Sequence, residues 1–204
     1  YKDGADLFLN PAIESALLPA FGKAYGAELL VRKNAGKLTG WVGYTYSRTL
    51  RQVQKNTGAE TINKGKFYPS NVDKPHDLAV VANYKFTRRI SMSANFTYNT
   101  GRPITYPDEV YVIDGYTFTQ FSDRNQGRTP DYHRLDISFT LEGNLKQAQK
   151  YKGSWTLSIF NVYRRKNAYS IFFKPEYRGA RPQAYRLSVL GSVFPSLTYN
   201  FKIN

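Results

Sequence analysis

Residues 101–130 hold the densest group of side chains that could bind a ligand. They combine aromatic rings, which stack on planar or ring-shaped molecules, with groups that donate or accept hydrogen bonds. Sets of this kind bind sugars, peptides or chelates. Together with one residue of the preceding loop, the candidate ligand-binding residues are Tyr68, Arg102, Tyr106, Tyr111, Asp114 and Tyr116. The structural alternative carries equal weight: residues 109–118 would form a β-ribbon whose aromatic side chains pack on adjacent loops.

No arrangement of residues predicts catalysis or a metal site. The chain has no cysteine, which excludes thiolate ligands, cysteine nucleophiles and disulfides. The two histidines, His76 and His133, have no second ligand at metal-binding spacing, so we interpret His76 as a residue of a loop-to-strand junction. The sequence also lacks a glycine-rich phosphate loop and a Gly-x-Ser-x-Gly motif. We therefore expect a protein that is not an enzyme and has no catalytic residues, metal or cofactor.

Alternation of apolar and polar residues predicts the elements that position these side chains. Between Ile90 and Asn99 the even positions are apolar and the odd positions are polar, which is the pattern of a β-strand with two different faces. Further strands are predicted at residues 25–33, 38–49, 78–86, 134–142, 153–174 and 195–204. A break in phase at 160–163 is assigned to a bulge. The sequence thus predicts an all-β fold of about seven antiparallel strands.

The apolar face of these strands is predicted to contact lipid. Seventeen Tyr and 13 Phe occur in a chain whose mean hydropathy is −0.53, so apolar groups are spread singly among polar ones. An isolated sheet would leave two long apolar edges, whereas a segment of a larger closed barrel has none. The alternative is the core of a soluble β-sandwich. The candidate lipid-facing residues are Leu78, Val80, Met92, Phe96, Leu135, Ile137, Phe139, Leu197, Tyr199 and Phe201.

Connections between the predicted strands alternate in length. Short turns are expected at 34–36 and 87–88, with a modest basic turn at 143–152, and long polar loops near 50–76, 101–130 and 175–184. This is the layout of an antiparallel transmembrane β-barrel with short periplasmic turns and long extracellular loops. Aromatic residues near the predicted strand ends fit two interfacial girdles.

Several segments, taken in order, resemble the barrel of TonB-dependent outer-membrane receptors of the Bacteroidetes type. They are GKAYGAELLVRKN (22–34), GKLTGWVGYTYSRT (36–49), DKPHDL (73–78), NTGRPIT (99–105), SIFNVY (158–163) and FPSLTYNF (194–201). The resemblance covers residues 22–204. The chain departs from it at Ile203 and Asn204, where the family has a terminal aromatic residue.

The resemblance implies that residues 1–204 are the C-terminal part of a barrel of about 22 strands, with the plug domain outside this chain. Residues 1–24 would be an extracellular loop and residues 25–204 barrel strands with their loops. The implied function is ligand capture and TonB-dependent import across the bacterial outer membrane. The implied partners are the plug domain, the remaining barrel strands, TonB and a surface lipoprotein. The alternatives are a structural barrel subunit of a surface or secretion assembly, and a soluble β-sandwich binding module.

The strongly basic balance predicts an anionic partner. The formal net charge is +14, and the cations cluster at turns and loops. Outer-membrane lipid and lipopolysaccharide are the expected partners, because extracellular cations could contact their phosphates. Nucleic acid is not expected, because the cations lie at both ends of the strands instead of lining one stacking face.

Overall fold

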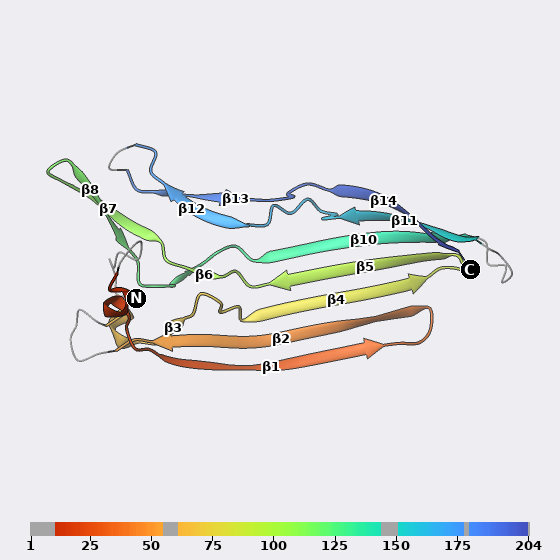
Figure 1. Cartoon of the computed structure of the whole chain (residues 1–204), viewed down its shortest axis with the longest axis horizontal. Helices are drawn as coiled ribbons and strands as arrows, with labels where there is room; N and C mark the ends of the chain where they lie inside the picture. The colour runs from red at the N-terminus through yellow and green to blue at the C-terminus, as the bar shows by residue number, and fades with distance from the viewer. Residues whose placement is uncertain (1–10, 55–60, 144–150, 178–179, 204) are drawn as a thin grey trace.

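The main element of the protein is one long antiparallel sheet, and three two-stranded sheets accompany it in the described residues (Figure 1). The computed structural model describes residues 11–54, 61–143, 151–177 and 180–203. Seven long strands lie side by side in chain order, and each is hydrogen-bonded to its neighbours. Short turns and larger loops connect successive strands. They are β1 (Phe21–Lys33), β2 (Leu38–Gln52), β4 (His76–Lys85), β5 (Ile90–Asn99), β10 (Tyr132–Glu142), β11 (Tyr151–Phe160) and β14 (Phe194–Ile203). Within the described residues the sheet is open, with β1 and β14 at its two edges.

Cross-strand register separates apolar from polar residues onto opposite faces. Val42, Val80, Phe96 and Leu135 lie opposite one another in a row across β2, β4, β5 and β10. Successive side chains of a strand point to opposite faces, so the row one position along, which includes Asn95 and Asp136, lies on the other face. We call these the apolar face and the polar face of the sheet.

All ten side chains predicted to face lipid lie on the apolar face. The register that aligns Phe96 with Leu135 also aligns Met92 with Phe139. The row that contains Phe139 continues through Leu157 on β11 to Leu197 on β14. The Leu197 side chain is 64% exposed. Among the residues that the structure describes, only Val53, Ile62 and Tyr68 are buried hydrophobic side chains, and they lie beside the loop end of β2. The sheet therefore has no conventional core against either face in this part of the chain.

The predicted all-β, antiparallel architecture is confirmed. The helical elements within the described ranges are two short 3₁₀ turns, η1 (Ile13–Ala16) and η3 (Asn63–Gly65). No helix in those ranges is long and apolar enough to cross a membrane. Figure 1 places the short turns at one end of the sheet and the loop elements at the other.

The single strand predicted at 153–174 is wrong, because the structure divides it. Strand β11 ends at Phe160, and Asn161 (φ 53°) and Arg164 (φ 56°) adopt left-handed conformations that an extended strand does not contain. The Asn161 side chain stabilises this break by donating to backbone carbonyl oxygens, including that of Arg165 at 3.1 Å. After the break, β12 (Ser170–Lys174) pairs with β13 (Gln183–Leu187) in a separate two-stranded sheet. The loop predicted near 175–184 connects these two strands, since β12 ends at Lys174 and β13 begins at Gln183, and its residues 178–179 lie outside the described residues.

Other predicted boundaries shift by a few residues. Strand β1 begins at Phe21, inside the predicted loop 1–24, of which residues 1–10 lie outside the described ranges. The loop predicted at 50–76 contains β3 (Tyr68–Pro69), which pairs with β2, and its residues 55–60 are not described. Most of the turn predicted at 143–152 likewise falls on residues 144–150, which are not described.

The loop predicted at 101–130 is itself built from strand pairs. β6 (Pro103–Ile104) pairs with β9 (Gly127–Arg128), and beyond them β7 (Pro107–Ile113) pairs with β8 (Tyr116–Phe121). The predicted ribbon is thus present, and it projects from the loop end of the sheet (Figure 1).

Candidate binding site at the loop end of the sheet

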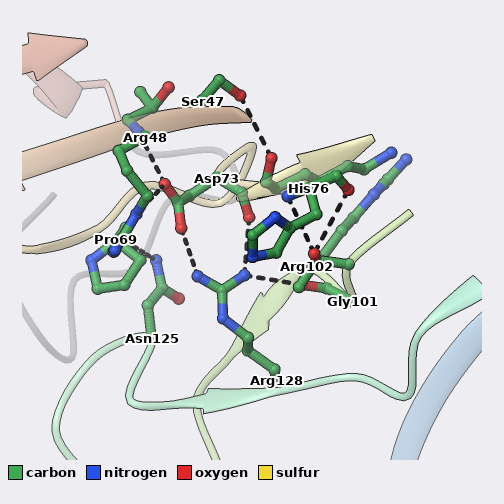
Figure 2. Close-up of polar contacts among 12 residues, drawn as sticks. Ser47, Arg48, Pro69, Asp73, His76, Gly101, Arg102, Asn125 and Arg128 are labelled. Carbon is green, nitrogen blue, oxygen red and sulfur yellow. Dashed lines mark hydrogen bonds and ion pairs between the residues drawn. The ribbon is translucent and has the colours of Figure 1, made fainter. Parts of the chain in front are cut away.

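A buried carboxylate ties together the loops at this end. The Asp73 side chain is 0% exposed and accepts hydrogen bonds from the Thr49 backbone N–H at 2.7 Å and from Arg48 Nε at 3.2 Å. A terminal nitrogen of Arg128 pairs with its second carboxylate oxygen. Figure 2 shows Asp73 between the two guanidinium groups. A buried carboxylate is stable only with such partners, so Asp73 fixes the loop that carries it against β2 and β9.

The same partners keep Asp73 ionised. Burial alone raises the pKa of its carboxyl group, but the hydrogen bonds from the Thr49 N–H, Arg128 and Arg48 outweigh that effect and lower the pKa below its ordinary value. The carboxylate therefore stays charged and keeps accepting these bonds at neutral pH.

Arg128 also spans two backbone segments. One terminal nitrogen, Nη1, donates to the carbonyl oxygens of Asp73 and Gly101, at 2.9 Å in both cases (Figure 2). The Gly101 N–H donates in turn to Asp131 at 2.8 Å. A side chain at position 101 would overlap the Thr129 carbonyl group, so only glycine allows the two segments to approach this closely.

Asparagine side chains make a second link between the loops. The Asn125 amide donates to the Pro69 carbonyl oxygen at 2.8 Å and to the Asn71 side chain at 2.6 Å. Asn63 exchanges two hydrogen bonds of 2.8 Å with the backbone of Arg124. These bonds join segments more than 50 residues apart in the sequence, so the loop region 61–76 and the region 101–131 form one connected unit.

A cavity of about 680 Å³ opens beside this unit on the polar side of β5 and β10. Asn99 and Tyr132, which lie opposite each other on the polar face, form its floor. Residues 167–171, after the break in β11, form another wall. The full lining comprises Lys74, Asn99, Thr100, Gly101, Arg102, Thr129, Pro130, Tyr132, Asn167, Ala168, Tyr169, Ser170, Ile171 and Val189. It contains two cations and no acidic side chain.

One of the predicted ligand-binding residues, Arg102, lines this cavity. Tyr68 does not, because it is 6% exposed and packs with Val53 and Ile62. Tyr106 has a structural role: its hydroxyl donates to the Arg128 carbonyl oxygen at 2.8 Å and its ring meets Phe173 edge-on. Tyr68 and Tyr106 thus make contacts within the protein, and ligand contact by either residue stays a prediction.

The remaining three predicted residues lie on the ribbon, away from the cavity lining. Tyr111 belongs to β7 and hydrogen-bonds to Glu109 and Gln120, whereas Tyr116 opens β8 and is 72% exposed. Asp114 (φ 50°) and Gly115 (φ 78°) form the turn between the two strands. Two consecutive left-handed residues define a type I′ turn, for which Asp-Gly is a preferred pair. Asp114 thus shapes the ribbon.

Sequence reasoning missed most of the cavity. Lys74, Tyr132, Asn167 and Tyr169 come from three segments that the sheet brings together, and no local spacing relates them. One available signal was Asn161 after an apolar strand, since asparagine is favoured in left-handed conformations and marks the break that places Asn167.

In the described ranges, no group of three His, Cys, Asp or Glu side chains could hold a metal ion. Comparison of the chain with protein-family models, with curated proteins and with solved structures finds no match in any of the three.

Proposed function

We propose that this chain is a β-barrel segment of an outer-membrane receptor that captures a ligand and imports it with energy supplied through TonB. The observation that carries the proposal is the two-faced, single-layer sheet. Its apolar face is continuous over seven strands, although no element of the described chain covers it. Sheets exposed to water bury such a face, whereas a membrane barrel turns it toward lipid.

Strand length supports the same proposal. Strands β4, β5, β11 and β14 have ten residues each and β10 has eleven. A transmembrane β-strand needs about 9–11 residues. Strands in water-soluble domains are usually shorter, with about five or six residues as the commonest length.

Aromatic side chains gather at both ends of the apolar face. Near the turn end, the rings of Trp155 and Tyr199 lie 4.6 Å apart. Near the loop end, the Tyr44 hydroxyl hydrogen-bonds to His76 at 2.8 Å and Tyr98 lies in the same row. Two belts of amphipathic rings at the ends of an apolar band are typical of proteins that meet two membrane interfaces.

Receptor function, as opposed to a purely structural barrel, is supported by the cavity on the polar face. In a closed barrel the polar face would line the interior, where the plug domain would contact it, and the cavity would open toward the extracellular loops. Lipid and lipopolysaccharide would surround the apolar face, and a surface lipoprotein could dock on the loops. No side-chain arrangement in the part of the chain that the structure describes points to a chemical reaction, and we propose transport without catalysis.

A barrel subunit of a surface or secretion assembly is the second candidate function, because the exposed ribbon β7–β8 offers Tyr116, Phe118 and Phe121 to a partner. The third, a soluble β-sandwich, would require a second sheet to cover the apolar face.

The experiment is fractionation of the native host, followed by alkaline extraction and intact-mass measurement. The proposal expects the polypeptide to remain in the outer-membrane pellet, with a mass several times 23.4 kDa. Ligand uptake should then stop when TonB is deleted. Recovery in the aqueous fraction would favour the sandwich, and uptake that survives TonB deletion would favour the structural subunit.

A further inference from the structure

We propose that the 680 Å³ cavity at the loop end binds a soluble saccharide that carries a carboxylate or phosphate group, held between Lys74 and Arg102. This inference rests on the proposed receptor function and names its ligand class. It is carried by two unpaired cations, by the shared anchoring of the backbone segments that bear them, and by unused hydroxyl groups in the lining.

The two cations of the cavity are free to bind an anion. Within the described residues, the Lys74 ammonium and the Arg102 guanidinium have no ion-pair or hydrogen-bond partner. Two carboxylates beside these segments are already occupied: Asp73 is bound by Arg128 and Arg48, and Asp131 by Tyr98 and the Gly101 N–H. An anion would therefore supply the missing partner, and charge-assisted hydrogen bonds to it are the strong kind.

Arg128 anchors the two backbone segments that carry the cations. Its Nη1 donates to the carbonyl oxygens of Asp73 and Gly101, the residues that directly precede Lys74 and Arg102. The Arg102 backbone is held further by the Thr129 hydroxyl at 2.9 Å and the Thr129 N–H at 2.8 Å. Both cation-bearing segments are thus anchored to one partly buried guanidinium group, which reduces the cost of ordering them when a ligand binds.

The opposite wall of the cavity is also held in place. Asn167 exchanges two hydrogen bonds with the backbone of His133, at 3.1 and 2.9 Å, and its own carbonyl oxygen accepts from Ser188 at 2.6 Å. The same stretch contributes Tyr169 and Ser170 to the cavity lining, and β10 contributes Tyr132. Within the described ranges, the hydroxyl groups of these three residues form no hydrogen bond, so they are available to a ligand.

These features together select a charged saccharide. A cavity of this volume lies within the range of about 300–1,000 Å³ that small ligands occupy. Tyrosine rings stack on sugar rings, free hydroxyls bond to sugar hydroxyls, and the cations bind the acidic group. A membrane lipid is disfavoured, because the cavity lies on the polar side of the sheet and lipid would meet the apolar face.

The test is calorimetric titration of the full-length protein in detergent with three probes: digalacturonate, its uncharged methyl ester, and glucose 6-phosphate. The variants are Lys74→Gln, Arg102→Gln and the double variant, with Lys37→Gln at the opposite end of the sheet as control. We expect the wild type and the control to bind at least one acidic probe, more weakly as salt is raised. Each single variant should bind the acidic probe about 10-fold more weakly than the wild type does. The wild type should bind the neutral ester at least about 10-fold more weakly than the acid.

The inference is overturned if neither acidic probe binds, if the ester binds as well as the acid, or if the double variant matches the wild type. Binding to lipopolysaccharide vesicles that is lost in the double variant, without binding of either probe, would assign the cations to lipid and also overturn it. Membrane fractionation is scored separately. If the protein inserts into the membrane but binds no acidic probe, the proposed function stands and the ligand inference fails. If the protein is recovered in the aqueous fraction and binds the probe, the ligand inference stands and the proposed function fails.

Discussion

Arg128 holds Asp73 by its side chain and its backbone at once: the guanidinium pairs with the buried carboxylate and donates a 2.9 Å hydrogen bond to the carbonyl oxygen of the same residue. The two residues are 55 positions apart, so this contact joins two long loops. Because the same guanidinium reaches Gly101, the geometry of the cavity depends on it.

Replacing Asp73 by asparagine should destabilise the loop end. The amide keeps the shape of the side chain, but it leaves two partly buried guanidinium groups without a counter-charge and turns a donor toward them. Breaking a buried ion pair costs about 3–5 kcal/mol, and we expect about 3 kcal/mol here. Denaturation of the detergent-folded protein would measure this. Asp123→Asn, at an exposed loop position without an ion pair, is the matched control and should change little.

The low pKa of Asp73 predicts how loop-end stability depends on pH. A carboxyl whose pKa is lower in the folded protein contributes stability that is complete above the ordinary pKa of about 4 and is lost as the pH falls through the folded value. Asp131 acts in the same direction. Hydrogen bonds from the Tyr98 hydroxyl and the Gly101 N–H lower the pKa of its carboxyl group and outweigh burial, which raises it. The free energy of unfolding should therefore be flat near neutrality and fall in acid. In Asp73→Asn this acid-induced fall should be shallower, and an unchanged slope would contradict the assignment.

The turn role assigned to Asp114 predicts a clear order among substitutions. Asp114→Asn and Asp114→Gly should leave the β7–β8 ribbon intact, since both residues tolerate a positive φ. Asp114→Val should cost about 1–2 kcal/mol, because a β-branched residue is strained in that conformation. Hydrogen exchange of residues 116–121 reports the ribbon directly. If Asp114→Gly abolished ligand binding while exchange stayed slow, the carboxylate would have to be a ligand contact after all.

The strands could be predicted from the sequence because their signal is local. An alternation of period two, as between Ile90 and Asn99, determines which face each side chain occupies, and the cross-strand register follows once one face is apolar. The binding site could not be predicted in the same way. Asp73 and Arg128 are ordinary charged residues of polar loops, and only the pairing of β2, β4, β5 and β10 in one sheet brings them together. The packing of Tyr68 and Tyr106 could not be predicted for a related reason, since residue type alone does not tell whether a loop tyrosine packs or binds.

Two adjacent residues of β5 give the sharpest test of the membrane proposal. Phe96 lies on the apolar face between Val80 and Leu135, whereas Asn95 lies on the polar face between Val81 and Asp136. Phe96→Arg should impair insertion, at a cost of roughly 2–4 kcal/mol if the residue meets the centre of the bilayer. Asn95→Arg places the same charge one residue away, beside the Asp136 carboxylate, and should insert normally. Refolding into liposomes, followed by protease protection, measures both variants. Equal insertion of the two would mean that the apolar face does not contact lipid, because in that case the bilayer could not distinguish the two faces of the strand.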